Sequence, residues 1–249
     1  MWRLALVLLM LGFDVPAASS AGIPPVVAVY PSGLTVPENL LRISIRFAAA
    51  PTQPVLRKIA LKNPDGSILD AAFLEQELWS TDGTVLTVLL DPGRVKTGLV
   101  VHDLLGRALT AGRPVELLLD DQVIKSWQVR EEKRTAPNPK EWHIAPPQAG
   151  TSAPLRVLLE APIDAMAVNL IAVAAPDGSR VTGRATLGAG ESTWMFSPDQ
   201  AWAGGSYKLM IHPRLEDACG NEVVEPFEQP AQVTVAKVPY SIEVPFQIE

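Results

Sequence analysis

Short apolar runs with a period of two residues recur along the chain and end at turn signals. From Leu41 to Phe47 every odd position is apolar, while the even positions hold Arg42, Ser44 and Arg46. This alternation is typical of a β-strand with one buried face. Comparable runs lie at 26–30, 59–62, 85–90, 115–119, 124–129, 155–159, 171–175, 193–197 and 207–211. Their number and spacing predict an all-β protein.

The same unit is written twice. The stretch 171–179 matches 59–67 at six of nine positions with an offset of 112 residues, and both copies end in Pro-Asp-Gly-Ser. Pro fixes φ near −65° and Gly accepts a positive φ, so both copies predict a tight turn. The alternating strand at Leu41 returns at Leu155 with an offset of 114 residues. The chain therefore predicts two tandem β-sandwich domains.

Composition shifts divide the chain into five segments. Arg130 to Arg134 is a charge run, and the Pro-rich stretch after it marks a stiff linker. After residue 241 the even positions are apolar, which predicts an extended tail. That tail is either an edge strand of this molecule or an exposed edge that recruits a partner strand. We expect a signal peptide at 1–21, sandwiches at 24–132 and 142–228, a linker at 133–141 and the tail at 229–249.

The N-terminus predicts export. A positive residue, Arg3, precedes an almost wholly apolar stretch from Leu4 to Phe13, and the small residues Ser19 and Ala21 follow. These three regions describe a secretory signal peptide cleaved after Ala21. The apolar stretch is shorter than the roughly 20 residues that a membrane helix needs. We expect a periplasmic or secreted protein without a membrane span after cleavage.

Composition and spacing predict no catalytic, cofactor-binding or metal-binding residues. The formal net charge is −6 and no basic block exists, so nucleic acid is not an expected partner. Cys219 is the one cysteine, which excludes an internal disulfide and favours a buried, inert thiol. His102, His143 and His212 are far apart and lack metal-ligand spacing. Nucleophile-elbow and phosphate-loop motifs are missing as well, so we do not expect an enzyme.

One stretch of the first unit has no counterpart in the second. Apolar residues from Arg94 to Leu109 recur at spacings near three and four, compatible with a short helix. The favoured interpretation is a loop that crosses between two sheets, with His102 and Asp103 on its solvated edge. The sequence does not indicate why this insert exists.

A family resemblance rests on two motifs of the second unit, Trp202-x-x-Gly205-x-Tyr207 and Asp217-x-x-Gly220-Asn221. Together they resemble the bacterial Ig-like repeats of the SbsA type, found in S-layer and other exported bacterial proteins. The resemblance implies a seven-stranded Ig-like sandwich and no enzymatic activity. In the first unit Asp120-Asp121-Gln122 stands in place of the second motif. Glu216 and Asp217 suggest a calcium loop, but a turn in which Asp and Asn bond their own backbone is the simpler interpretation.

Two functional hypotheses follow. The leading one is an exported, non-catalytic tandem Ig-like protein with a structural or protein-interaction role in the bacterial envelope or exterior. Its partner would be another envelope protein or a cell-surface polymer, bound at an edge strand or at an interdomain cleft near Trp142. The alternative is a carbohydrate-binding sandwich that stacks sugars on exposed tryptophans. The candidates are Trp79, Trp127, Trp142, Trp194 and Trp202, of which alternation turns Trp194 inward with Phe196.

Overall fold

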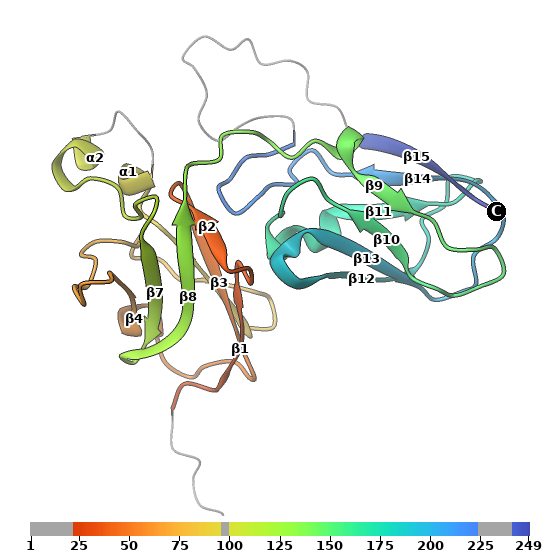
Figure 1. The fold of residues 1–249 in the computed structure, drawn as a ribbon. Helices are drawn as coiled ribbons and strands as arrows, with labels where there is room; N and C mark the ends of the chain where they lie inside the picture. Colours follow the sequence, from red (N-terminus) through yellow and green to blue (C-terminus); the bar gives the residue numbers. More distant parts are fainter. Residues whose placement is uncertain (1–21, 96–99, 224–240) are drawn as a thin grey trace, which may run out of the picture.

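The structure, a computed structural model, describes residues 22–95, 100–223 and 241–249 (Figure 1). The predicted signal peptide at 1–21 lies outside the described residues, as do residues 229–240 of the predicted tail. Two β-sandwiches lie side by side, the first on the left of the view and the second on the right. Both are built from mainly antiparallel sheets, which confirms the all-β prediction of two tandem Ig-like sandwich domains.

The first sandwich has two four-stranded sheets. One runs in the order β1 (Val26–Tyr30), β3 (Arg42–Phe47), β6 (Val85–Leu89) and β5 (Leu78–Trp79). The other runs in the order β2 (Thr35–Pro37), β8 (Gln122–Arg130), β7 (Pro114–Leu119) and β4 (Ile59–Lys62). β2 is parallel to β8, whereas the other pairs are antiparallel.

The second sandwich has a four-stranded and a three-stranded sheet. The larger has the order β12 (Gly183–Leu187), β13 (Thr193–Pro198), β10 (Leu155–Leu158) and β9 (His143–Ala145). The smaller has the order β11 (Ile171–Ala174), β14 (Gly205–Ile211) and β15 (Ile242–Ile248). In chain order this is the ABED and CFG arrangement of a seven-stranded Ig-like domain.

Both Pro-Asp-Gly turns form in the same way. Gly66 and Gly178 have φ of 86° and 83°. The carboxylates of Asp65 and Asp177 each accept the backbone N–H two residues on, at 2.9 Å, and the hydroxyl of that serine. The serine hydroxyl and N–H hold the pKa of both carboxyls below the usual value. The sequence repeat is therefore a repeat of strand and turn.

The last hairpin of the first sandwich departs from the second copy. Asp120 and Asp121 have φ of 48° and 62°, so both central residues of the β7–β8 turn are left-handed. A two-residue turn with both φ positive matches the right-handed twist of the strands. The Lys58 ammonium group lies 3.2 Å from the Asp120 carboxylate. The substituted motif thus closes the hairpin tightly where the second sandwich carries a longer loop.

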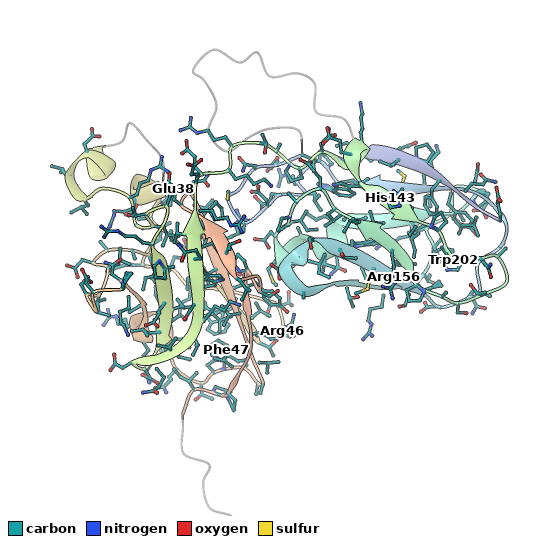
Figure 2. All side chains as sticks on the ribbon, viewed as in Figure 1. Glu38, Arg46, Phe47, His143, Arg156 and Trp202 are labelled. Carbon is teal, nitrogen blue, oxygen red and sulfur yellow. The ribbon has the colours of Figure 1, made fainter. Side chains whose placement is uncertain are left out.

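The insert crosses from β6 to β7 through two short helices, α1 (Pro92–Val95) and α2 (Val100–Leu105). A crossing between sheets is confirmed, and helical turns rather than plain loop carry it. Arg94 is buried and donates to the carbonyls of Gly106 at 2.8 Å and Asp70 at 2.5 Å. Arg107 binds the carboxylate of Glu38, labelled in Figure 2, at 2.7 Å. The insert is therefore held by arginines that satisfy loop carbonyls and carboxylates.

The remaining helical turns are 3-10 helices at η1 (Leu56–Lys58), η2 (Pro139–Glu141), η3 (Ala165–Leu170) and η4 (Ala189–Glu191). Across the described residues, every helix is too short or too polar to cross a bilayer.

Residues 242–248 form an edge strand of this molecule, which confirms the first of the two expectations for the tail. β15 pairs with β14 from Ile248 opposite Gly205 to Ile242 opposite Ile211. Phe246 stacks on Tyr207 with ring centroids 5.7 Å apart. Pro245, which lacks an N–H, lies in a strand that has a neighbour on one side only among the strands that the structure describes.

Each sandwich encloses its own hydrophobic core. In the second one, Trp194 and Phe196 are buried, as the alternation predicted, and Tyr207, Leu209 and Ile211 are buried beside them. Two separate cores explain why the repeat folds as two domains rather than one.

Strand β10 offers a matched test of this packing. Leu155 is fully buried and Leu158, three residues on, is 56% exposed. We expect Leu155→Ala to lower the free energy of unfolding by about 2–5 kcal/mol, because a buried side chain leaves a cavity. Leu158→Ala should change it by about 0.5 kcal/mol or less. Urea unfolding measures both, and equal losses would contradict the assigned register.

Candidate functional site

The loop after β14 forms the turn that its sequence predicts. One oxygen of the Asp217 carboxylate accepts the backbone N–H of Cys219 at 2.9 Å and of Asn221 at 3.0 Å. Gly220 takes a φ of 82° and donates its N–H to the Asp217 carbonyl. The other carboxylate oxygen lies 3.1 Å from the Asn221 side-chain nitrogen and 3.2 Å from the Lys133 ammonium group. Both oxygens thus serve protein donors, which supports the turn interpretation. In the described part of the chain, acidic, His and Cys side chains form no metal-binding group of three or more.

This turn docks the second sandwich on the first. The Ala218 carbonyl accepts the N–H of Leu41 at 2.9 Å and the N–H of Arg42 at 3.2 Å, at the start of β3. Ala218 also packs against the core of the first sandwich. The loop that distinguishes the second repeat is therefore an interdomain contact.

The linker residue Lys133 is held from both sides. Its carbonyl accepts the side-chain N–H of Asn39 at 2.7 Å and of Asn221 at 3.2 Å. Its N–H donates to the side-chain oxygen of Asn39 (Oδ1) at 2.9 Å. The Cys219 thiol is buried and lies 3.6 Å from that same Asn39 oxygen. The linker begins as a fixed element of the junction.

Charged side chains meet between the domains. The guanidinium of Arg42 binds the Glu216 carboxylate, and its Nε lies 3.8 Å from the buried carboxylate of Asp164. The second sandwich supplies the acids, and Arg42 and Lys133 supply the cations. Asp164 and Asp217 are buried, so the loss of a cation would leave their carboxylates uncompensated. The charges therefore fix the junction in one register.

The loop that holds Gly190 and Glu191, at the same end of the second sandwich, also contacts the first sandwich. Both carboxylate oxygens of Glu191, which is 2% exposed, accept the N–H of Ser32 at 3.1 and 3.2 Å. The Ser32 hydroxyl accepts the N–H of Gly190 at 2.9 Å. Glu191 has a φ of 53°, a conformation that is unfavourable for a side-chain-bearing residue. The hydrogen bonds from Ser32 hold Glu191 in this conformation.

The junction covers part of a strand face that alternation alone would leave to solvent. Arg42 is half-buried and Ser44 is buried, although both lie on the polar face of β3. Ser44 pairs with the hydroxyl of Thr87 at 2.8 Å, and the second sandwich lies over it. Arg46, further along the strand, is exposed (Figure 2).

We expected an interdomain cleft near Trp142, but Trp142 is not among the residues that line the pocket between the domains. A small pocket of about 200 Å³ between the domains is lined by Pro31, Pro37, Pro162, Glu191 and Ala218 among others. Trp142 instead packs in the core of the second sandwich, next to the first residue of β9. The linker therefore ends by burying Trp142, and His143 lies exposed on β9 (Figure 2).

The five tryptophans do not form an aromatic platform. Trp127, Trp142, Trp194 and Trp202 are at most 7% exposed. The indole N–H groups of Trp127, Trp194 and Trp202 donate to the carbonyls of Pro31, Val168 and Ala153. Trp79 is partly buried and donates to Glu77 at 2.9 Å. Among these five, no exposed coplanar pair is available to stack a sugar.

The remaining candidates from the sequence do not converge. His143 and His212 are exposed, and the His102 side chain lies outside the described residues. Cys219 is buried as predicted, and burial raises the pKa of its thiol. The residues of the junction that the sequence did not indicate are Ser32, Arg42, Asp164 and Glu191. They come from loops and a strand end with no local motif.

Comparison with known proteins does not assign the chain to a family. Neither a protein-family model nor a curated protein matches it. Among solved structures, an I-band fragment of titin, I67–I69, matches at 10% identity over 84% of this chain and 58% of its own, with a TM-score of 0.23. The pullulanase SAP of Group B Streptococcus matches at 9% identity over 75% and 21%, with a TM-score of 0.23. Native alpha-2-macroglobulin from Escherichia coli matches at 13% identity over 77% and 66%, with a TM-score of 0.22. The chain spans less than two thirds of the titin fragment and about a fifth of that pullulanase.

Burial makes Asp164 the pH-sensitive group of the junction. Desolvation raises its pKa to about 6 against the pull of Arg42, and the charges of Glu216 and Asp217 add to the rise. The unfolded state gives up this proton at a lower pH than the folded state does. The stabilising contribution is therefore complete below about pH 4 and is lost as the pH rises through 6.

We expect Asp164→Asn to abolish this dependence, since Asn keeps an acceptor for the Met166 N–H without a charge. From pH 4 to pH 6.5 the free energy of unfolding of the wild type should fall relative to the variant by up to roughly 3 kcal/mol. Urea titrations at a series of pH values measure it. Parallel curves for the two proteins would show that Asp164 does not titrate in this range.

Proposed function

We propose that this chain is an exported, non-catalytic Ig-like protein with a structural or protein-interaction role in the bacterial envelope or exterior. The observation that carries the proposal is that the loops at one end of the second sandwich contact the first sandwich. The loops of the second sandwich around Asp164, Glu191 and Asp217 pair with the first sandwich instead of facing solvent. In Ig-like variable domains the loops at this end bind ligands. Here they join two domains, which suits a spacer or scaffold.

The proposal includes kinship with the SbsA-type repeats. Its support is the pair of motifs in the second unit, Trp202-x-x-Gly205-x-Tyr207 and Asp217-x-x-Gly220-Asn221. Both motifs have structural roles in the fold. The rings of Trp202 and Tyr207 pack edge to face with centroids 5.6 Å apart, and Asp217 accepts the backbone N–H groups that shape the docking turn. Residues of this kind serve folding and assembly rather than chemistry.

The partner in this proposal is another envelope protein or a cell-surface polymer, with contacts at sheet edges and outer faces. A sandwich has edge strands whose N–H and C=O groups can accept a further strand. The acidic net charge of −6 disfavours nucleic acid. The N-terminal pattern of Arg3, an apolar stretch and Ala21 supports export.

Export is tested by expressing the full chain in a bacterium and sequencing the N-terminus of the periplasmic or secreted protein. We expect it to begin at Gly22, the residue after the predicted cleavage site. Retention of Met1 in a cytoplasmic fraction would overturn the export part of the proposal.

The interaction role is tested by affinity capture from envelope extracts, with residues 22–249 as bait. We expect one or a few envelope proteins, or a surface polymer, to be retained through a salt wash. Capture of nothing by a stable, folded bait would contradict the role.

A further inference from the structure

A groove of about 640 Å³ opens along one edge of the first sandwich. We call it the edge groove. Strand β4 and the residues before it form one wall, and the segment 68–77 forms the other. Its apolar lining includes Leu56, Ile59, Ala60, Ala72, Phe73 and Leu74.

The second sandwich shows why this edge is open. There the chain returns after β11 into a five-residue β12, and η3 packs against that strand. In the first sandwich the corresponding β5 has two residues, and the segment before it takes a longer path. Residue Ala71, with a φ of 47°, marks the bend in that path. Phe73 and Leu74 then pair with the end of β6 in the opposite sheet. The two walls separate because the crossing segment leaves one sheet for the other.

The backbone of β4 turns one acceptor and one donor toward this groove. The carbonyl of Lys58 faces β7, because it accepts the N–H of Asp120. Alternation along an antiparallel strand then turns the carbonyl of Ile59 and the N–H of Leu61 to the open edge. On one side of Ala60, segment 67–69 already pairs with this edge, since the Leu69 N–H donates to the Leu61 carbonyl and the Asn63 N–H to the Ser67 carbonyl. On the other side, the Ile59 N–H donates to the Leu56 carbonyl. One acceptor and one donor flanking Ala60 match the backbone of a single added residue.

The rim of the groove is acidic. Asp70 and Glu75 are exposed, and their carboxylates form no ion pair within the described part of the chain. Glu77 is occupied, since it accepts the N–H groups of Val55 and Leu56 at 2.6 and 2.7 Å and closes one end. Arg57 is the one cation of the lining. Two free carboxylates around an apolar floor favour an apolar side chain flanked by basic residues.

We propose that the edge groove binds an extended segment of a partner protein, which pairs with β4 beside Ala60 and seats an apolar side chain between basic neighbours. The inference rests on the proposed interaction role and names its surface. Main-chain hydrogen bonds to Ile59 and Leu61 supply register, the groove supplies apolar contact and Asp70 and Glu75 select the charge.

The test uses the peptide acetyl-Lys-Val-Ile-Val-Lys-amide, titrated into ¹⁵N-labelled residues 22–249. We expect saturable shifts of the amide signals of Leu61 and Leu69. The double variant Asp70→Lys/Glu75→Lys should weaken binding at least tenfold. The matched control Glu131→Lys/Glu160→Lys, which makes the same charge change at exposed positions elsewhere, should bind as the wild type does.

Two altered peptides separate charge from strand pairing. Replacing both lysines by glutamate, or N-methylating the central isoleucine, should each weaken binding at least tenfold. No shift at Leu61 with millimolar peptide would overturn the proposal. Equal affinity of the two double variants, or of the original and N-methylated peptides, would do so too.

Affinity capture with the same baits distinguishes this inference from the proposed function. Loss of the partner from Asp70→Lys/Glu75→Lys, but not from Glu131→Lys/Glu160→Lys, supports the groove. Recovery of the partner by both variants overturns the groove and leaves the interaction role intact. Equal melting temperatures show that the variants are folded.

Discussion

The Asp217 carboxylate is the constraint on which the arrangement of the two domains depends. It binds two N–H groups of its own turn and lies beside the Lys133 ammonium group, so it shapes the docking loop and holds the linker together. Because the loop is fixed, the Ala218 carbonyl reaches the start of β3. Arg42, Glu216 and Asp164 then fall into one cluster. The loop motif that shapes the second domain thereby also positions it against the first domain.

This arrangement shapes what surface is left for function. The loop end of the second sandwich is covered by the junction, and Trp127, Trp142, Trp194 and Trp202 are buried in the cores. Outer sheet faces, sheet edges and the edge groove remain on the surface. The interaction role that we propose would therefore use a sheet edge. The groove belongs to the first sandwich alone, because the longer crossing before β5 has no counterpart in the second.

The sandwiches could be predicted from the sequence because period-two alternation and Pro-Asp-Gly turns are local signals. Strands β3 and β10, and both turns, lie where the repeat places them. The junction could not be predicted, since Ser32 and Glu191 are 159 residues apart and each looks like an ordinary loop residue. The position of Arg42 could not be predicted for the same reason. Alternation places this polar residue on the solvent face of its strand, but the second domain covers that part of the face. The groove depends on the length of β5, which no turn motif sets.

We infer that the junction locks both sandwiches into one rigid unit. The most direct test of this claim is a distance distribution by electron–electron double resonance, with spin labels at Val123 and Leu158, which are exposed in different domains. Cys219 is replaced by serine so that two labelling sites remain. We predict one narrow distribution that broadens when Asp217→Ala removes the turn. A broad distribution in the protein with an intact Asp217 would contradict the claim, because the domains would then move independently.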